Sequence, residues 1–454
     1  MELNKLMFRE YDIRGIYGED INEEVSYLIG RGYASTLKKL GKDKALVGYD
    51  NRTSSPIIEK NVIKGLVESG IKVVRLGLVT TPMYYYAWDK LDVHAGIMIT
   101  ASHNPKEYNG FKFSYNGIHN ACGKDVYDLY DTIIAKDFID GEGSVEDADI
   151  NEDYIKYILS DIRLGNRKVK VVFDCGNGTT CIVAKDIFGN MNIDSVPLFA
   201  ESDPEFPNHH PDPLVEENLR QLKDVVIKEK ADLGIAFDGD GDRVGVVDEN
   251  GNMIDIDKYQ IIIWRDIYNK VELKKGFFDV KCSKALEDEL IKLGIEPVVN
   301  RTGNSYMKKT SYEGNFPFGG ELSGHVFFRD RFNGNDDGIY AGIRLIEILS
   351  NTDKKLSELL DNISIYYSTK ELKVHVDDEV KFDVINKVKE YCLNKNYKIL
   401  DIDGVKALFE DGSALVRASN TGPNITMRYE AKTESRLKEI EDEFNKLLDE
   451  LINK

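Results

Sequence analysis

The sequence predicts an α/β protein, with three related α/β domains of mixed, mainly parallel sheets and a C-terminal α+β domain, placed around a central cleft. An order of strand, loop, helix and strand recurs at 45–77, 169–198 and 277–301. Apolar runs that alternate with helical periods are typical of βαβ units. From about residue 370 the pattern changes to alternating strand-like runs and one amphipathic helix. A chain of 454 residues is also too long for one core, which favours about three domains or more.

The three repeats arrange their elements alike. In the first, the strand ALVGYD, the loop NRTSSP, the helix IIEKNVIKGLVESG and the strand IKVVRLG follow one another. The second has the strand KVVFD, the loop CGNGTT, a helical stretch and the strand IDSVPL. The third has FFDVK, CS, the helix KALEDELIKLG and IEPVVNR. We therefore expect domains at 1–150, 151–252, 253–366 and 367–454, with no low-complexity linker between them.

The last domain is expected to combine strands with a closing helix. ELKVHV, ALVRAS and ITMRYEA have the pattern of strands. The helix that follows carries an apolar stripe at helical spacing, which predicts core packing and no further function. The stripe consists of Leu437, Ile440, Phe444, Leu447, Leu448 and Leu451.

The composition limits the classes of molecule that the protein is expected to bind. The net charge of −19 argues against nucleic acid and acidic membranes, and it repels anionic substrates unless a local basic site exists. The N-terminus lacks an apolar signal core and no long apolar run follows, so we expect no membrane partner. The 5 cysteines are scattered without a C-x-x-C pair, which indicates neither a disulfide framework nor a zinc site and favours a reducing cytoplasm. The oligomeric state stays open.

The strongest local signal is the run DGDGDR at 238–243, between the apolar runs LGIAF and VGVVD. Asp238, Asp240 and Asp242 alternate with glycines and can converge on one hard cation, and oxygen-only ligation favours Mg²⁺ or Ca²⁺ over zinc. A solvated acidic loop is the plain alternative. An EF-hand is excluded because Arg243 stands where its loop needs glycine and the flanks have the pattern of strands. The run predicts a Mg²⁺ site whose open position suits a phosphate oxygen.

A second motif, TASHNP at 100–105, follows the strand-like run AGIMI. Ser102 stands at the end of a buried strand, where a serine can act as nucleophile, although the setting is not the G-x-S-x-G elbow of α/β-hydrolases. An ordinary turn is the alternative, and the adjacent His103 cannot be assumed to be the base. Phosphoryl transfer needs a carrier oxygen near a metal, and the chain offers both. Lys112, just beyond, would steady phosphate charge or move a proton.

A third motif is GGELSGH at 319–325. Its glycines allow close backbone approach, while Glu321 and Ser323 offer an acceptor and a donor to neighbouring sugar hydroxyls. His325 is a side chain that can titrate near neutrality. The alternative is a turn with a structural histidine.

A fourth motif, RASNTGPN at 417–424, combines a guanidinium with short polar side chains. Arg417 matches phosphate bidentately, so the motif predicts the local basic site that the net charge requires. A solvated turn is the alternative. Further candidates for this basic site are Tyr11, Arg14, Lys281 and Arg243.

The segment CGNG at 175–178 follows a strand, as a dinucleotide-binding loop would. Cys181 stands where the third glycine of that fingerprint belongs, and no convincing acidic partner follows. We interpret the segment as a packing turn between a strand and a helix.

In this order, the four loops resemble those of the α-D-phosphohexomutase family. YDIRG at 11–15, TASHNP, DGDGDR, GGELSGH and RASNT are close matches, as are FPNHHPDP at 206–213 and HVFFRDRFNGNDDGIYAGIRLIEIL from 325. The resemblance spans nearly the whole chain. ELSGH and RASNT are most similar to the prokaryotic dual-specificity phosphomannomutase/phosphoglucomutase group, whereas phosphoglucosamine mutases usually have Gln where Leu322 stands.

The resemblance implies four domains around a central cleft, with one loop from each. It implies that Ser102 is the phosphoserine and that Glu321 and Ser323 grip the sugar. The implied ligands of Mg²⁺ are Ser102, Asp238, Asp240 and Asp242. The implied ligands of the phosphate that does not react are Arg417, Ser419, Asn420 and Thr421.

Asn304 marks one departure from the family pattern. Relatives of the dual-specificity group commonly have T-G-H-S where this chain has TGNS at 302–305. Asn304 can hydrogen-bond a substrate but cannot be cationic, which bears on the preferred sugar or phosphate.

We expect a reversible mutase that interconverts the 1-phosphates and 6-phosphates of mannose, glucose or both. Phosphorylated Ser102 gives its phosphoryl group to the free sugar position, the 1,6-bisphosphate turns over within the cleft, and its other phosphate returns to Ser102. Glucose 1,6-bisphosphate or mannose 1,6-bisphosphate would act as activator. Mg²⁺, Arg243 and Lys112 would neutralise charge. His325 and Lys112 are the candidates for proton transfer.

Two other functions stay open at this point. A phosphatase would hydrolyse the same esters, and stable phosphate on the isolated protein would argue against it. A sugar-phosphate sensor would bind without chemistry, and activity with glucose 1-phosphate would exclude it. The sequence does not distinguish mannose, glucose and glucosamine phosphates, since Glu321 and Ser323 are expected to meet hydroxyls common to these sugars.

Overall fold

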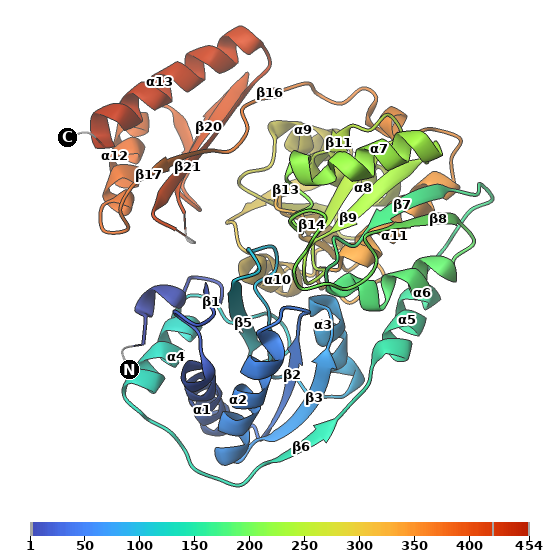
Figure 1. The fold of residues 1–454 in the computed structure, drawn as a ribbon. Coiled ribbons are helices and arrows are strands. Elements are labelled where there is room, and N and C mark those ends of the chain that lie inside the picture. Colours follow the sequence, from blue (N-terminus) through green and yellow to red (C-terminus); the bar gives the residue numbers. More distant parts are fainter. Residues whose placement is uncertain (1–2, 420–421, 453–454) are drawn as a thin grey trace.

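The computed structural model describes residues 3–419 and 422–452, and its strands form four sheets in chain order (Figure 1). The first three sheets mix parallel and antiparallel pairs, and the fourth is antiparallel. The predicted class, three α/β units followed by an α+β unit, is confirmed. The domain boundaries stay a prediction.

The first unit has a six-stranded sheet in the order β1-β5-β4-β2-β3-β6, in which β5 runs antiparallel to β4 and β1. Its helices begin with ordinary signals, since Asn22 accepts a hydrogen bond from Val25 N at α1 and Pro56 lies in the first turn of α2. The strands are β1 (Ile13–Ile16), β2 (Lys44–Tyr49), β3 (Lys72–Leu78), β4 (Gly96–Ile99), β5 (Tyr108–Ser114) and β6 (Ser144–Asp147). The helices are α1 (Glu23–Lys39), α2 (Ser55–Glu68), α3 (Thr81–Lys90) and α4 (Lys124–Ile134).

The second unit has a five-stranded sheet in the order β11-β10-β9-β7-β8. β7 pairs in parallel with β8 and β9, and β10 is antiparallel to its neighbours. The strands are β7 (Lys170–Asp174), β8 (Asp194–Leu198), β9 (Leu233–Phe237), β10 (Val244–Asp248) and β11 (Met253–Ile254). The helices are α5 (Asn151–Ser160), α6 (Ala184–Gly189) and α7 (Arg220–Glu229). β11 lies just past residue 252, the predicted end of this domain.

The third unit has a four-stranded sheet in the order β13-β12-β14-β15. The strands are β12 (Lys275–Asp279), β13 (Glu296–Asn300), β14 (Phe318–Gly320) and β15 (Val326–Phe328). The helices are α8 (Ile256–Ile267), α9 (Lys284–Lys292), α10 (Asn304–Glu313) and α11 (Gly338–Ser350).

The C-terminal unit pairs its strands in the order β16-β21-β20-β19-β18, and β17 also pairs with β21. Two helices cover this sheet, and the predicted stripe of α13 packs into its core through Ile440, Phe444 and Leu448. The strands are β16 (Tyr367–Ser368), β17 (Leu372–His375), β18 (Lys398–Leu400), β19 (Val405–Phe409), β20 (Gly412–Ala418) and β21 (Asn424–Ala431). The helices are α12 (Lys381–Asn394) and α13 (Glu434–Ile452). Short 3-10 helices in the chain are η1 (Lys5–Met7), η2 (Thr179–Ile182), η3 (Glu216–Leu219) and η4 (Ser357–Leu360).

Each unit carries one of the four motifs on an antiparallel hairpin. The hairpins are β4–β5, β9–β10, β14–β15 and β20–β21. The sequence repeat correctly predicted the parallel pairs β2–β3, β7–β8 and β12–β13. It did not predict the hairpins, because each repeat ends at its second strand.

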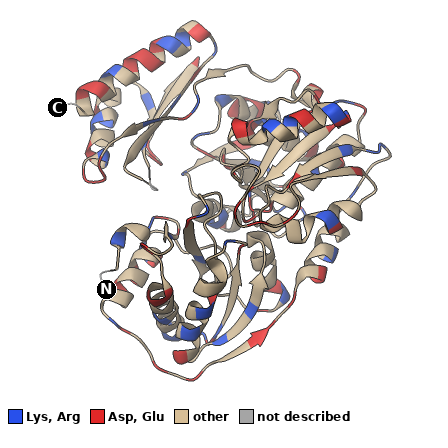
Figure 2. Ribbon diagram, in the orientation of Figure 1, with Lys and Arg blue, Asp and Glu red and all other residues tan. Residues whose placement is uncertain are grey.

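Three large apolar cores lie between the sheets and helices. One joins the first sheet to α1, α2 and α4, and a larger one extends from α3 across the second and third units. The C-terminal unit has its own core. Charged residues follow the outer helices such as α7 and α13, while the strands are mostly uncharged (Figure 2). Within the part of the chain that the structure describes, every helix is too short or too polar to cross a bilayer.

Candidate active site

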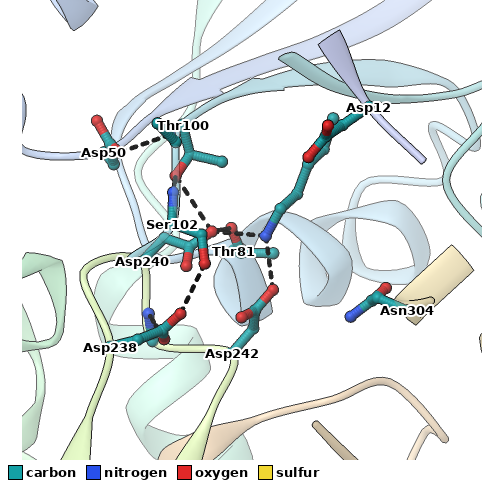
Figure 3. A network of polar contacts seen from close by, with 12 residues as sticks. Asp12, Asp50, Thr81, Thr100, Ser102, Asp238, Asp240, Asp242 and Asn304 are labelled. Carbon is teal, nitrogen blue, oxygen red and sulfur yellow. Dashed lines mark hydrogen bonds and ion pairs between the residues drawn. The ribbon is translucent and has the colours of Figure 1, made fainter. Parts of the chain in front are cut away.

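Ser102 lies in the loop after β4 with a backbone φ of 51°, a left-handed conformation that is uncommon outside glycine. The residue is 2% exposed. Its Oγ donates a hydrogen bond of 2.8 Å to Asp238 Oδ2 (Figure 3). The same Oγ lies 3.3 Å from His103 Nδ1. Strained residues of this kind cluster at active sites. The predicted nucleophile is thus held directly against the predicted metal-binding loop.

Arg52 fixes the shape of the serine loop. Its guanidinium is buried, and its Nε donates to Asp50 Oδ2 at 3.1 Å. The two Nη atoms donate to backbone carbonyls at 2.6 to 3.0 Å. These carbonyls belong to Ser102, Asn104, Pro105 and Tyr108. Sequence reasoning missed Arg52; the only signal was its place in a loop that follows a parallel strand.

Asp238, Asp240 and Asp242 converge in the loop between β9 and β10. One carboxylate oxygen of each residue lies within 4.8 Å of one oxygen of each of the other two, and all three residues are buried. Gly239 permits the contact with the serine loop, because a Cβ there would lie 2.5 Å from the Ser102 carbonyl oxygen. Lys112 Nζ donates to Asp240 Oδ2 at 2.7 Å and to Asp242 Oδ2 at 2.6 Å.

This carboxylate cluster fits a divalent cation. Asp240 Oδ1 and Asp242 Oδ1 are buried and have no hydrogen-bond partner within residues 3–419 and 422–452, whereas buried polar atoms are normally paired. Burial, together with the other two carboxylates, raises the pKa of Asp238 well above its usual value. Burial and the Asp242 carboxylate also raise the pKa of Asp240. The Lys112 ammonium outweighs both effects and holds the pKa of Asp240 below its usual value. An oxygen-only set with excess negative charge is suited to a hard cation such as Mg²⁺.

His325 lies beside the metal-binding loop. Its Nε2 accepts a hydrogen bond of 3.1 Å from Arg243 Nε, and its Nδ1 lies 2.7 Å from Asp336 Oδ2 and 3.0 Å from Asn304 Nδ2. An Nε2 that accepts leaves the ring proton on Nδ1, which donates it to Asp336. The Asp336 carboxylate therefore fixes the tautomer of His325.

Lys308 is the cation that faces Asp336. It is 2% exposed, and its Nζ lies 2.9 Å from Asp336 Oδ1 and 2.8 Å from the ring centroid of Tyr85 on α3. Burial lowers the pKa of Lys308 to about 8. Burial favours the neutral acid of Asp336, but Lys308 and His325 hold its pKa below the usual value. Sequence reasoning missed both residues; the run NDDGIY was matched to the family without a role for Asp336.

Glu321 and Ser323 lie in the hairpin loop between β14 and β15. Glu321 is buried, and its Oε1 accepts a hydrogen bond of 2.7 Å from Gly303 N. Burial raises the pKa of Glu321. Leu322 N donates to Asp279 Oδ1 at 3.0 Å, which ties this loop to the end of β12.

Arg417 lies on β20 and is 7% exposed. Its Nε and Nη2 lie 3.1 Å and 3.0 Å from Asp403 Oδ2. Thr302 N, in the third unit, donates to the same oxygen at 3.1 Å. Asp403 therefore joins the C-terminal unit to the loop that precedes Asn304, and sequence reasoning missed it.

The remaining predicted substrate-binding residues come from three units. Arg14 on β1 donates through Nη1 to Asn104 Oδ1 of the serine loop at 2.8 Å. Tyr11 precedes β1, and Lys281 follows β12. Ser419 follows β20, and Asn420 and Thr421 lie outside the described residues.

The structure joins most of these residues in one region. One set of hydrogen bonds and ion pairs includes Ser102, Lys112, Asp238, Asp240, Asp242, Arg243, Asn304 and His325, with the Asp336 carboxylate accepting from both Asn304 and His325. The four-unit fold and this network define an α/β enzyme that holds a serine hydroxyl against a carboxylate site for a cation.

The chain belongs to the phosphoglucomutase/phosphomannomutase family. Residues 5–137, 152–251 and 255–366 match its alpha/beta/alpha domains I, II and III, and residues 371–447 match its C-terminal domain. The resemblance found in the motifs is therefore confirmed. The chain is an enzyme of the mutase class.

Individual relatives match over at least 95% of their length. A phosphomannomutase/phosphoglucomutase of Pseudomonas aeruginosa is 40% identical over 442 residues, which cover 97% of this chain and 95% of the relative. A phosphoglucomutase of Neisseria gonorrhoeae is 37% identical over 450 residues, with 98% and 96% covered. The crystal structure of a phosphoglucomutase/phosphomannomutase family protein from Burkholderia thailandensis superimposes with a TM-score of 0.92 at 35% identity, covering 99% of this chain and 98% of that one.

Proposed function

We propose that this enzyme interconverts hexose 1-phosphates and hexose 6-phosphates, of glucose, mannose or both, and that it carries the phosphoryl group on Ser102. The observation that supports the proposal most is the contact of 2.8 Å between Ser102 Oγ and Asp238, made from a strained loop position. It puts a carrier oxygen at a cation site, as phosphoryl transfer requires. The names of the relatives point to the same reaction.

Charge neutralisation is the second part of the proposal. Asp238, Asp240 and Asp242, together with the Ser102 oxygen, would hold Mg²⁺, which when bound supplies positive charge to phosphoryl oxygens. Lys112 adds a fixed positive charge. Burial favours its neutral amine, but Asp240 and Asp242 outweigh this and raise the pKa of Lys112, so it stays an ammonium. Lys112 is therefore better suited to stabilise charge than to accept a proton.

Proton transfer is assigned to His325. In the first transfer the bond between phosphorus and the Ser102 oxygen breaks, a bond between phosphorus and the free sugar hydroxyl oxygen forms, and that hydroxyl loses its proton. In the second transfer the bond between phosphorus and the other sugar oxygen breaks, the bond between phosphorus and the Ser102 oxygen forms again, and the released sugar oxygen takes up a proton. Because Asp336 holds the ring proton on Nδ1, the lone pair of His325 is on Nε2, the atom that meets Arg243. This tautomer can act as a base once a sugar hydroxyl replaces Arg243 Nε as the donor to Nε2.

Substrate binding is shared between two motifs. Glu321 and Ser323 would meet sugar hydroxyls. The distal phosphate would be bound by Arg417, Ser419, Asn420 and Thr421. The same phosphate site would hold the 1,6-bisphosphate of glucose or mannose, which we expect to activate the enzyme by phosphorylating Ser102. A reducing cytoplasm stays the predicted location.

A substrate panel tests the proposal. The protein would be incubated with Mg²⁺, a trace of glucose 1,6-bisphosphate and the 1-phosphate of glucose, mannose or glucosamine. Formation of the 6-phosphate from glucose or mannose is expected, together with phosphate on Ser102 in the isolated protein. Inorganic phosphate as product would indicate a phosphatase instead, and binding without turnover would indicate a sensor. Absence of any 6-phosphate would overturn the proposal.

A further inference from the structure

The segment Asp403–Lys406, called here the bridging segment, connects the C-terminal unit to two loops of the third unit. Asp403 and Gly404 lie between β18 and β19, and Lys406 is the second residue of β19. The C-terminal unit, which carries these residues, is drawn in orange and red in Figure 1. The first and last residues of the bridging segment, Asp403 and Lys406, each hydrogen-bond to backbone groups of the third unit. The two partner loops carry Asn304 and Lys281, both assigned above to substrate binding.

Asp403 positions Arg417. One carboxylate oxygen meets Arg417 Nε and Nη2, and it also accepts from Thr302 N. The ion pair with Asp403 is formed by the Nε–Nη2 edge of the Arg417 guanidinium, and Nη1 is not part of this pair. The side chains of Asp403 and Arg417 are 7% and 8% exposed, so the pair is shielded from water. A guanidinium held along one edge presents its remaining N–H donors in a fixed direction.

Gly404 explains why the bridging segment lies so close to Arg417. Its φ is +77°, and a Cβ at this position would lie 2.5 Å from both Arg417 Cβ and Val416 O. Only a residue without a side chain allows Asp403 to turn back onto the guanidinium.

Lys406 acts at the second loop. Its Nζ donates to Val280 O at 2.9 Å and to Cys282 O at 3.1 Å, and Arg428 donates to the carbonyl between them, that of Lys281. Three successive carbonyls of the third unit are thus held by cations of the C-terminal unit. Lys406 is 8% exposed, so these hydrogen bonds lie away from solvent.

The same loop reaches the sugar-binding motif. Asp279 precedes Val280, and its Oδ1 accepts a hydrogen bond of 3.0 Å from Leu322 N, between Glu321 and Ser323. A continuous chain of contacts therefore runs from the bridging segment to the hairpin that carries the sugar-binding residues.

We propose that Asp403 and Lys406 are positioning residues, which hold the phosphate-binding Arg417 in register with the Asn304 and Lys281 loops. The proposal rests on the proposed function. Neither residue is assigned contact with substrate. Each acts through a group that does, so losing it should weaken phosphate binding more than it slows the chemical step.

Steady-state kinetics on the full-length protein test this. Asp403→Ala should raise the KM for the hexose 1-phosphate about tenfold or more, the usual cost of a lost charge-assisted contact, with a much smaller change in kcat. It should also release more glucose 1,6-bisphosphate per turnover. Asp403→Asn keeps an acceptor for Thr302 N but loses the charge, so an intermediate KM is expected. Asp401→Asn is the matched control, because Asp401 lies two residues away and forms an exposed ion pair with Lys389.

Lys406 is tested by rescue. Lys406→Met should raise KM, whereas Lys406→Arg should restore it in large part because a guanidinium can donate to the same carbonyls. Lys398→Met, on an exposed position of β18, is the control.

A double mutant separates positioning from general destabilisation. If Asp403 acts through Arg417, Asp403→Ala should raise KM little further in an Arg417→Ala background. Full additivity of the two effects, or an unchanged KM in Asp403→Ala, would overturn the proposal. If the unmutated protein neither turns over nor binds hexose phosphates by calorimetry, the proposed function itself is wrong, which is a distinct result.

Discussion

Ser102 Oγ donates a hydrogen bond of 2.8 Å to Asp238 Oδ2, and this bond joins two loops that are 136 residues apart in sequence. The two loops also touch through their backbones, at Gly239 and the Ser102 carbonyl. The serine and the cation site therefore form one unit, and a change in either loop should disturb both phosphoryl transfer and metal binding.

Ser102→Ala should abolish mutase turnover and leave folding and sugar-phosphate binding largely intact, because it removes only the oxygen that we propose as the carrier of the phosphoryl group. Intact-mass analysis of the unmutated protein should show a phosphorylated fraction that the variant lacks. Ser144→Ala, on the exposed strand β6, is the control and should keep both activity and phosphate. Near-normal turnover by Ser102→Ala would exclude it as the carrier.

Asp240→Asn should weaken Mg²⁺ binding, with activity partly recovered at high Mg²⁺, since it removes one of three converging carboxylates. It also removes the charge that pairs with Lys112. The measurements are calorimetric titration with Mg²⁺ and activity as a function of Mg²⁺ after chelation. Glu249→Gln is the control, because Glu249 hydrogen-bonds Ser357 away from the cluster. Full activity after exhaustive chelation would contradict the three-carboxylate assignment.

Arg417→Ala should raise the KM and release the bisphosphate before it reorients. Losing one bidentate, partly desolvated contact with phosphate costs about 2–3 kcal/mol, or roughly 30- to 150-fold in binding. Arg417→Lys should rescue only in part, because an ammonium cannot reproduce the planar fork. The assay follows KM and the bisphosphate released per turnover; unchanged values for both would mean that this motif does not bind the distal phosphate.

Asp337 should make stability depend on pH. Its carboxylate caps α11 by accepting from Tyr340 N and also accepts from Tyr154 OH, and burial raises its pKa from 3.8 to about 6. The folded protein therefore binds this proton more tightly than the unfolded chain. Its contribution to stability is fully present below about pH 4 and is lost as the pH rises through about 6, by up to about 3 kcal/mol.

The Asp337→Asn variant has no titratable carboxyl group at this position. The unfolding midpoint of the unmutated protein should fall relative to that of the variant between pH 4 and pH 7. Asp353→Asn, at an exposed position, should give a profile parallel to that of the unmutated protein. A constant difference between Asp337→Asn and the unmutated protein across this range would refute the prediction.

Residues within short motifs could be predicted from the sequence, because their spacing already implies their chemistry. Asp238, Asp240 and Asp242 alternate along one turn, and the structure shows them converging. The strands on either side were also recognised, because β9 and β10 are continuous apolar runs buried along their length.

The residues that position these motifs could not be predicted. Arg52, Asp336, Lys308 and Asp403 act on partners that are distant in sequence, and their own neighbours follow no pattern that separates them from surface charges. Burial is what distinguishes them, and burial depends on how the four units pack. The antiparallel hairpins were not predicted for a related reason. Contacts between distant parts of the chain decide how strands pair beyond each repeat, and a local sequence pattern does not show these contacts.

The separate core of the C-terminal unit has a consequence for how the enzyme fails on heating. Among the residues that the structure describes, this unit shares no large apolar core with the rest, and charged side chains such as Lys406, Arg428 and Asp403 hold it to the third unit. A small unit of this kind can unfold on its own as a cooperative region. Thermal inactivation is therefore expected to precede global melting and to reverse on cooling. A protease that cuts between the 3-10 helix η4 and β16 should release a folded fragment that contains Arg417.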